Sequence, residues 1–97
     1  MIEIRQTDNF VTWFADLKDL RARARIEARL RRVELGNFGV VEAVGEGVSE
    51  LKVDYGPGYR VYIAQRAKIL VIVLGAGTKK TQDKDIRSAI LLARDLE

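Results

Sequence analysis

Hydrophobic and polar residues alternate with a period of two in three short segments of the chain, which predicts β-strands. These segments are residues 2–5, 50–55 and 59–63. Residues 69–74 are apolar throughout, and such a run is typical of a strand that is covered on both faces. The Gly-Pro-Gly turn signal at 56–58 separates the second and third segments, so these two strands are expected to form a hairpin.

Apolar residues recur at helical spacing in two segments that precede the hairpin. The first predicted helix covers about residues 8–18, and either Thr7 or Asp8 suits its N-cap. The second covers about residues 20–35 and begins after Asp19 or its neighbour. The apolar stripe of the second helix, which should face the core, consists of Ala22, Ile26, Leu30 and Val33.

The remaining segments complete a predicted topology. Residues 40–47 are expected to form a connecting loop, and the Gly-Ala-Gly sequence at 75–77 should end the apolar strand. A last helix is expected after Thr81, with a stripe formed by Ile86, Ala89, Ile90 and Ala93. The order is then β-α-α-β-β-β-α. It describes an α+β fold with a largely antiparallel sheet, an N-terminal helical hairpin packed on one face, and a C-terminal helix.

The composition narrows the chemistry that the chain can perform. Its 97 residues fit a single domain, residues 1–97, and 47% of them are hydrophobic and 32% charged. It contains neither cysteine nor histidine, which excludes thiolate nucleophiles, cysteine-based metal sites and histidine-dependent triads. The formal net charge of +3 is a weak indication of a polyanionic partner. No apolar run approaches the ~20 residues of a membrane span, so a soluble cytoplasmic protein is expected.

Four basic residues are the main candidates for a functional site. Alternation places Lys52 and Arg60 on the same face of the predicted hairpin, and both side chains bind phosphate well. Lys79 and Lys80 follow the last strand, so all four charges are expected to converge if that strand pairs with the hairpin. Tyr62 shares this face and is expected to stack on a base. The alternative is that these residues are ordinary solvated charges on an exposed sheet face.

An arginine stripe on the second predicted helix is the other conspicuous feature. Its members, spaced at i, i+4, i+8 and i+11, are Arg21, Arg25, Arg29 and Arg32. The stripe suits a polyanion or an acidic protein partner. It is also compatible with a solvated helix face whose charges pair with neighbouring glutamates.

Two longer motifs give the chain a family resemblance. Residues 51–62, LKVDYGPGYRVY, and residues 74–86, LGAGTKKTQDKDI, resemble the signatures of the RelE/ParE toxins of type II toxin–antitoxin modules. The similarity is to their HigB-like "addiction module killer" branch and extends over essentially the whole chain. It implies a ribosome-dependent endoribonuclease that cuts mRNA without a metal or other cofactor. In such a reaction the ribose 2′-oxygen attacks its own 3′-phosphate and leaves a 2′,3′-cyclic phosphate.

The resemblance also implies roles for individual residues. Arg60 matches the arginine that would hold the scissile phosphate, and Lys52 would act as the base or stabilise charge. Lys79 or Lys80 would stabilise the leaving group or the pentavalent phosphate. The other residues expected to contact RNA are Tyr62, Lys68 and Lys84.

The same resemblance implies partners and leaves alternatives open. A cognate antitoxin, expected to be a helix-turn-helix protein encoded in the same operon, would neutralise the toxin, and DNA would be contacted only through that complex. The arginine stripe is the expected antitoxin-docking surface. Relatives of the ParE type inhibit DNA gyrase by binding it, so gyrase inhibition remains an alternative. A non-toxic remnant that only binds its antitoxin is another.

Overall fold

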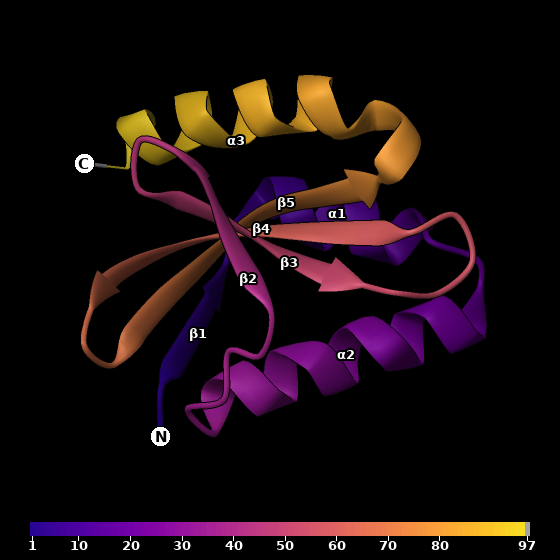
Figure 1. The fold of residues 1–97 in the computed structure, drawn as a ribbon, viewed down its shortest axis with the longest axis horizontal. Coiled ribbons are helices and arrows are strands. Elements are labelled where there is room, and N and C mark those ends of the chain that lie inside the picture. The colour runs from indigo at the N-terminus through magenta and orange to yellow at the C-terminus, as the bar shows by residue number, and fades with distance from the viewer. Residues whose placement is uncertain (97) are drawn as a thin grey trace.

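The computed structural model describes residues 1–96 and shows one twisted sheet with helices on both faces (Figure 1). The strand order in the sheet is β1-β5-β4-β3-β2, in which β1 runs parallel to β5 and every other pair is antiparallel. The elements are β1 (Glu3–Gln6), α1 (Asp8–Asp16), α2 (Leu20–Glu34), β2 (Val41–Gly45), β3 (Val48–Val53), β4 (Tyr59–Ala67), β5 (Leu70–Thr78), the 3-10 turn η1 (Lys79–Thr81) and α3 (Gln82–Asp95).

The predicted order β-α-α-β-β-β-α is wrong because the segment 40–47 contains a strand. The observed order is β1, α1, α2, β2 to β5 and α3, so two of the three helices precede four of the strands. β2 lies at the sheet edge and most of its side chains are exposed, which explains why it lacks a hydrophobic alternation. Glu46 and Gly47, with φ values of 51° and 80°, form the tight turn that returns the chain into β3.

The predicted end of the last strand at 75–77 is also wrong, since β5 continues to Thr78. The glycines allow side chains from neighbouring helices to lie against the strand. A Cβ at Gly75 would be 2.6 Å from Asn9 Nδ2, and one at Gly77 would overlap the Asp85 carboxylate. Glycine here marks a close approach of side chains to the backbone and not a strand end.

The helices confirm most of the sequence predictions. The Thr7 hydroxyl accepts a hydrogen bond from Phe10 N at 3.2 Å and so caps α1. Asp19 caps α2 by accepting from the backbone N–H groups of Arg21 and Ala22. α1 ends at Asp16, two residues before the predicted end. Each residue of the predicted α2 stripe is buried, namely Ala22, Ile26, Leu30 and Val33.

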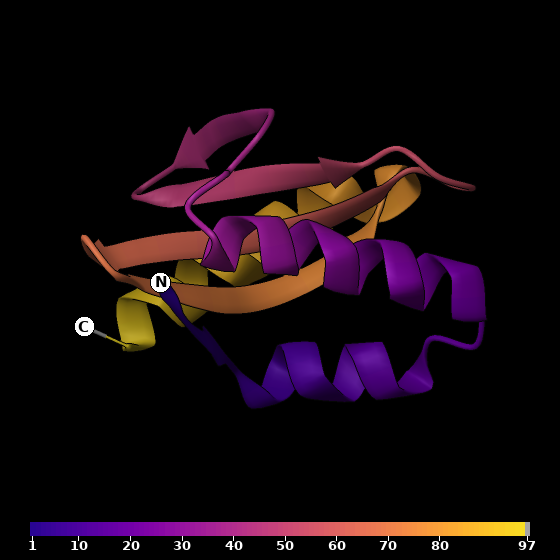
Figure 2. The ribbon, with the colours of Figure 1, turned by 90° about the horizontal axis from the view of Figure 1, so that it is seen from below.

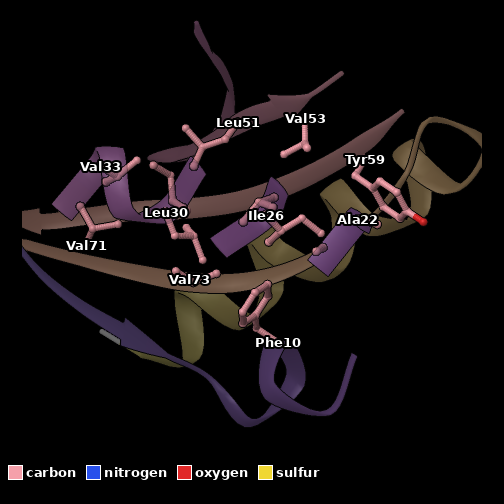
Figure 3. Packing of buried hydrophobic residues seen from close by; sticks show 13 residues of the cluster. Phe10, Ala22, Ile26, Leu30, Val33, Leu51, Val53, Tyr59, Val71 and Val73 are labelled. Atoms are coloured by element: carbon pink, nitrogen blue, oxygen red, sulfur yellow. The ribbon is translucent and has the colours of Figure 1, made fainter. Parts of the chain in front are cut away.

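The sheet lies between the α1–α2 pair and α3 (Figure 2), and a hydrophobic cluster occupies each of its faces. The larger cluster lies between the sheet and the α1–α2 pair, where Phe10 and Ile26 meet Val73 (Figure 3). The smaller cluster lies under α3, where Ala89 and Ala93 pack on the opposite face. The sheet face that carries Lys52, Arg60 and Tyr62 is therefore partly covered by α3, and this determines which of these residues can meet a ligand.

Candidate active site

Three of the four predicted cations are brought together by backbone pairing at one end of the sheet. Lys52 lies directly opposite Arg60 in the register of β3 and β4. Lys79 follows β5 and its backbone N–H donates to Gly58 O at 2.8 Å, at the end of the β3–β4 turn. Lys80 is the next residue of η1, so it lies beside the same end of the sheet.

Arg60 is held by two contacts and keeps one edge of its guanidinium unoccupied. Its Nη1 donates to Gly58 O at 3.0 Å, and its Nε lies 3.7 Å from Glu50 Oε2. The side chain is only 12% exposed, yet Nη2 donates no hydrogen bond to any of residues 1–96. A guanidinium oriented in this way offers a fixed donor to an oxyanion.

The carbonyl of Gly58 connects the site. It accepts hydrogen bonds from both the Arg60 side chain and the Lys79 backbone, and so joins the β3–β4 turn to η1. Gly58 has a φ of +78°, and a Cβ there would lie 3.1 Å from Arg60 Nη1. Glycine therefore suits the left-handed backbone, and a Cβ at this position would displace the Arg60 guanidinium by a few tenths of an ångström.

Lys52, Lys79 and Lys80, which together with Arg60 form the basic patch, are exposed, whereas Arg60 is largely covered. Lys52 Nζ lies 3.2 Å from Glu42 Oε1 on the neighbouring strand β2. This ion pair places the Lys52 ammonium group on the strand position opposite Arg60. Lys79 and Lys80 extend the positive charge beyond the end of β5.

Glu50 is a site residue that the sequence did not single out. Its side chain is fully buried, with Oε1 accepting a 2.6 Å hydrogen bond from Gln82 Nε2 and Oε2 facing Arg60. It therefore connects β3 to the first turn of α3 and orients Arg60. Alternation already placed Glu50 on the same strand face as Lys52, but no local pattern indicates that α3 covers this position.

The prediction that Tyr62 stacks on an RNA base is wrong. Its side chain is fully buried beneath α3, opposite Glu50 in the strand register. The phenol oxygen has no hydrogen-bond partner within residues 1–96. Burial, followed by the charge of Glu50, raises the pKa of Tyr62 well above its usual value, so the hydroxyl stays neutral. Tyr62 serves the packing under α3 and not ligand binding.

Tyr62→Phe should leave stability near neutral pH within about 1 kcal/mol of the wild type, because the hydroxyl that is removed makes no hydrogen bond. Since the folded protein holds the pKa of Tyr62 above the unfolded value, its stability should fall as the pH rises above about 10. The variant should lose less stability over this range. Urea unfolding at about pH 8 and about pH 11 measures the difference. A pH dependence in Tyr62→Phe equal to that of the wild type would contradict the expectation.

The two other predicted RNA contacts lie in different places. Lys84, in the first turns of α3, lines a hollow of about 400 Å³ together with Lys79 and Lys80, so it extends the basic patch. Lys68 lies in the turn between β4 and β5. β4 separates it from Arg60 by on the order of 25 Å, at the typical rise of a strand. The structure thus does not bring Lys68 to the site.

The predicted arginine stripe divides into exposed and buried members. Arg21, Arg25 and Arg32 are exposed on α2, but Arg29 is only 4% exposed, so its prediction as a docking residue is wrong. Arg29 Nη2 donates to Val40 O at 2.9 Å, and its Nε donates to Lys52 O at 3.3 Å. Burial, and then the charge of Arg32, lower the pKa of Arg29. Through these two hydrogen bonds, Arg29 joins α2 to β3 and to the segment that precedes β2.

A groove of about 480 Å³ runs beside Arg29, between α2 and β3. Arg25 and Arg32 line one wall and Lys52 the other. Arg25 also lies over the ring of Tyr55, with its guanidinium carbon 4.8 Å from the ring centroid. Two of the exposed arginines therefore line the same groove as Lys52 of the candidate site, together with the acidic Asp54.

The described residues offer neither a metal site built from acidic side chains nor a helix that spans a membrane. Residues 1–96 contain no group of three or more acidic side chains placed to hold a metal ion. None of the helices in this part of the chain is long and apolar enough to cross a membrane.

Comparison with known proteins places the chain in a family. It is 50% identical over 95 residues to an uncharacterized protein of Haemophilus influenzae (strain ATCC 51907 / DSM 11121 / KW20 / Rd). The alignment covers 98% of this chain and 96% of the relative. The chain belongs to the family of that protein. No model of a known protein family matches the sequence, and no solved structure matches it. The relative's name gives no activity, so the function has to be inferred from the site.

Proposed function

We propose that this protein is an endoribonuclease that cuts mRNA on the ribosome and acts as the toxin of a type II toxin–antitoxin module. The observation that supports this most is Arg60, which is fixed by Gly58 O and Glu50 and keeps Nη2 available for a phosphate oxygen. Lys52 and Lys79 lie beside it and add positive charge. The motifs at residues 51–62 and 74–86 support the same reading by their resemblance to RelE/ParE toxins.

The chemistry that suits this arrangement is an internal transesterification of RNA. The bond from the 2′-oxygen to phosphorus forms while the bond from phosphorus to the 5′-oxygen breaks. The 2′-hydroxyl loses a proton and the leaving oxygen gains one, both by exchange with water. Arg60 would bind a non-bridging oxygen through Nη2, where negative charge grows in the transition state. Lys52, together with Lys79 or Lys80, would stabilise the same charge.

The ends of the RNA fragments test this reaction directly. Purified protein added to translating ribosomes should produce mRNA fragments that carry a 2′,3′-cyclic phosphate and a 5′-hydroxyl. Primer extension should place the cuts in the A site, and ligation of end-specific adaptors should identify both termini. Intact mRNA would contradict the proposal, and intact mRNA accompanied by DNA damage in expressing cells would favour gyrase inhibition.

Gly58→Ala should reduce RNA cleavage by about tenfold or more, because misplacing Arg60 weakens an oriented phosphate contact. Gly56→Ala is a matched control, since φ is +56° there and the nearest atom to a new Cβ, in Tyr59, lies 4.0 Å away. Both substitutions should destabilise the fold by about 1 kcal/mol through the left-handed backbone. A cleavage assay with thermal unfolding of both variants separates these effects. Equal loss of cleavage in the two variants would show that Gly58 does not position Arg60.

The partner and the compartment belong to the same proposal. We place the protein in the cytoplasm, where its mRNA and ribosome targets are found, and we expect a cognate antitoxin to neutralise it. The exposed residues Arg21, Arg25 and Arg32 support docking of an acidic antitoxin segment along α2. Arg29 is excluded from this surface by its burial.

A further inference from the structure

A small hollow lies between α1 and α3, beyond the point where β1 stops pairing with β5. β1 pairs only with Leu70 to Val73, so the later residues of β5 have no strand neighbour on that side within residues 1–96. The hollow measures about 220 Å³. The residues that the argument needs from its lining are Asn9, Trp13, Gly75, Lys84, Asp85 and Ser88.

The Leu74 carbonyl, which precedes the lining residue Gly75, holds Asn9 in place. Thr7 Oγ1 and Asn9 Nδ2 both donate to Leu74 O, at 2.8 and 3.1 Å. A Cβ on Gly75 would lie 2.6 Å from Asn9 Nδ2, so glycine is what permits Asn9 to lie flat against the strand. With Nδ2 fixed in this way, Asn9 Oδ1 is left as an acceptor at the edge of the hollow.

The wall formed by α1 is aromatic and held in place. Trp13 packs edge-to-face on Tyr59, with the ring centroids 6.0 Å apart, and stacks near Phe10 at 6.2 Å. The indole is nevertheless only partly buried, and its Nε1 makes no hydrogen bond to residues 1–96. The hollow therefore offers an aromatic surface of fixed orientation together with polar groups that lack partners, including the exposed Ser88.

The opposite wall connects the hollow to the candidate active site. Lys84 lines both this hollow and the neighbouring one that contains Lys79 and Lys80. Asp85, also in the wall, lies against Gly77, which is the register partner of Arg60. A nucleotide chain bound at Arg60 thus has a ring-sized hollow beside it, with a lysine at the border.

We propose that this hollow binds a single nucleobase of the RNA substrate. The base lies against Trp13, its polar edge faces Asn9 and Ser88, and the phosphate attached to its ribose lies near Lys84. Pockets for drug-sized ligands measure roughly 300–1,000 Å³, so a smaller hollow suits one ring system. Proteins recognise single-stranded RNA by stacking unpaired bases on aromatic side chains and bonding their polar edges. Because the base belongs to the RNA substrate, this inference depends on the proposed function.

Trp13 is the single tryptophan of the chain, so its fluorescence reports directly on the hollow. The protein is titrated with AMP, GMP, CMP and UMP, and with ribose 5-phosphate as a probe that lacks a base. At least one nucleotide should quench Trp13 saturably, and ribose 5-phosphate should not. Ser88→Phe fills the hollow from an exposed position and should weaken this nucleotide by about tenfold or more. Leu91→Phe, also exposed on α3 but outside the hollow, should bind like the wild type.

Three results would overturn the assignment: no saturable quenching by any nucleotide, equal quenching by ribose 5-phosphate, or unchanged affinity in Ser88→Phe. Circular dichroism of each variant checks that it is folded. The titration involves no cleavage, so its outcome is independent of the proposed reaction. Nucleotide binding without RNA cleavage would refute the endoribonuclease and leave the base site in place. RNA cleavage without nucleotide quenching would refute only the base site.

Discussion

Arg60→Lys should reduce RNA cleavage by about 10²–10³-fold, the usual loss when one oriented donor to a transition-state oxyanion is removed. Lysine keeps a positive charge beside the buried Glu50, so the fold should survive. It cannot reproduce the planar fork that bonds Gly58 O through Nη1 and leaves Nη2 for phosphate. The measurement is the rate of fragment formation in the ribosome assay, alongside growth of cells that express the variant without antitoxin.

Arg5→Lys is the matched control for this substitution. Arg5 lies on β1, at the opposite edge of the sheet from β2, and its side chain is 63% exposed. The same chemical change there should leave cleavage and toxicity unaltered. If Arg60→Lys cut RNA as fast as the wild type, the phosphate-binding role of Arg60 would be refuted. Arg60→Ala is a poorer test, because it leaves the Glu50 carboxylate buried without a counter-charge and so also lowers stability.

Arg29→Glu should destabilise the protein by about 3 kcal/mol or more. The substitution places a carboxylate where Arg29 now donates to the carbonyls of Val40 and Lys52, so donors are replaced by a buried negative charge. Because domains of this size are stable by only about 5–15 kcal/mol, a large part of the folding free energy would be lost. Urea unfolding followed by circular dichroism measures the change.

Arg25→Glu makes the same change one helical turn earlier and provides the comparison. Arg25 is exposed and loses only its contact with the Tyr55 ring, so the expected destabilisation is below about 1 kcal/mol. If both variants lost the same free energy of unfolding, the difference in burial between the two arginines would be irrelevant to stability. The pair also guides tests of antitoxin docking, which should substitute Arg25 and Arg32 and avoid Arg29.

The helices and strands were predictable where their buried side chains leave a pattern of apolar residues in the sequence. The stripe of α2 and the caps at Thr7 and Asp19 follow from local rules of spacing and hydrogen bonding, and the structure has them where these rules put them. β2 was not predictable in this way. It is an edge strand held mainly by backbone pairing with β3, and its exposed side chains leave no periodic signal.

The candidate site was likewise predictable from the sequence only in part. The sequence alone determined that Lys52, Arg60 and Tyr62 share a strand face, because side chains alternate along any strand, and it determined that histidine takes no part. Only the tertiary structure decided that α3 covers Tyr62 and Glu50, and that Arg29 lies in the interior while Arg25 does not. Periodicity relates side chains within one element, whereas burial depends on a distant element packing against them. For this reason the sequence identified the charges, and the packing of α2 and α3 decided which of them are exposed.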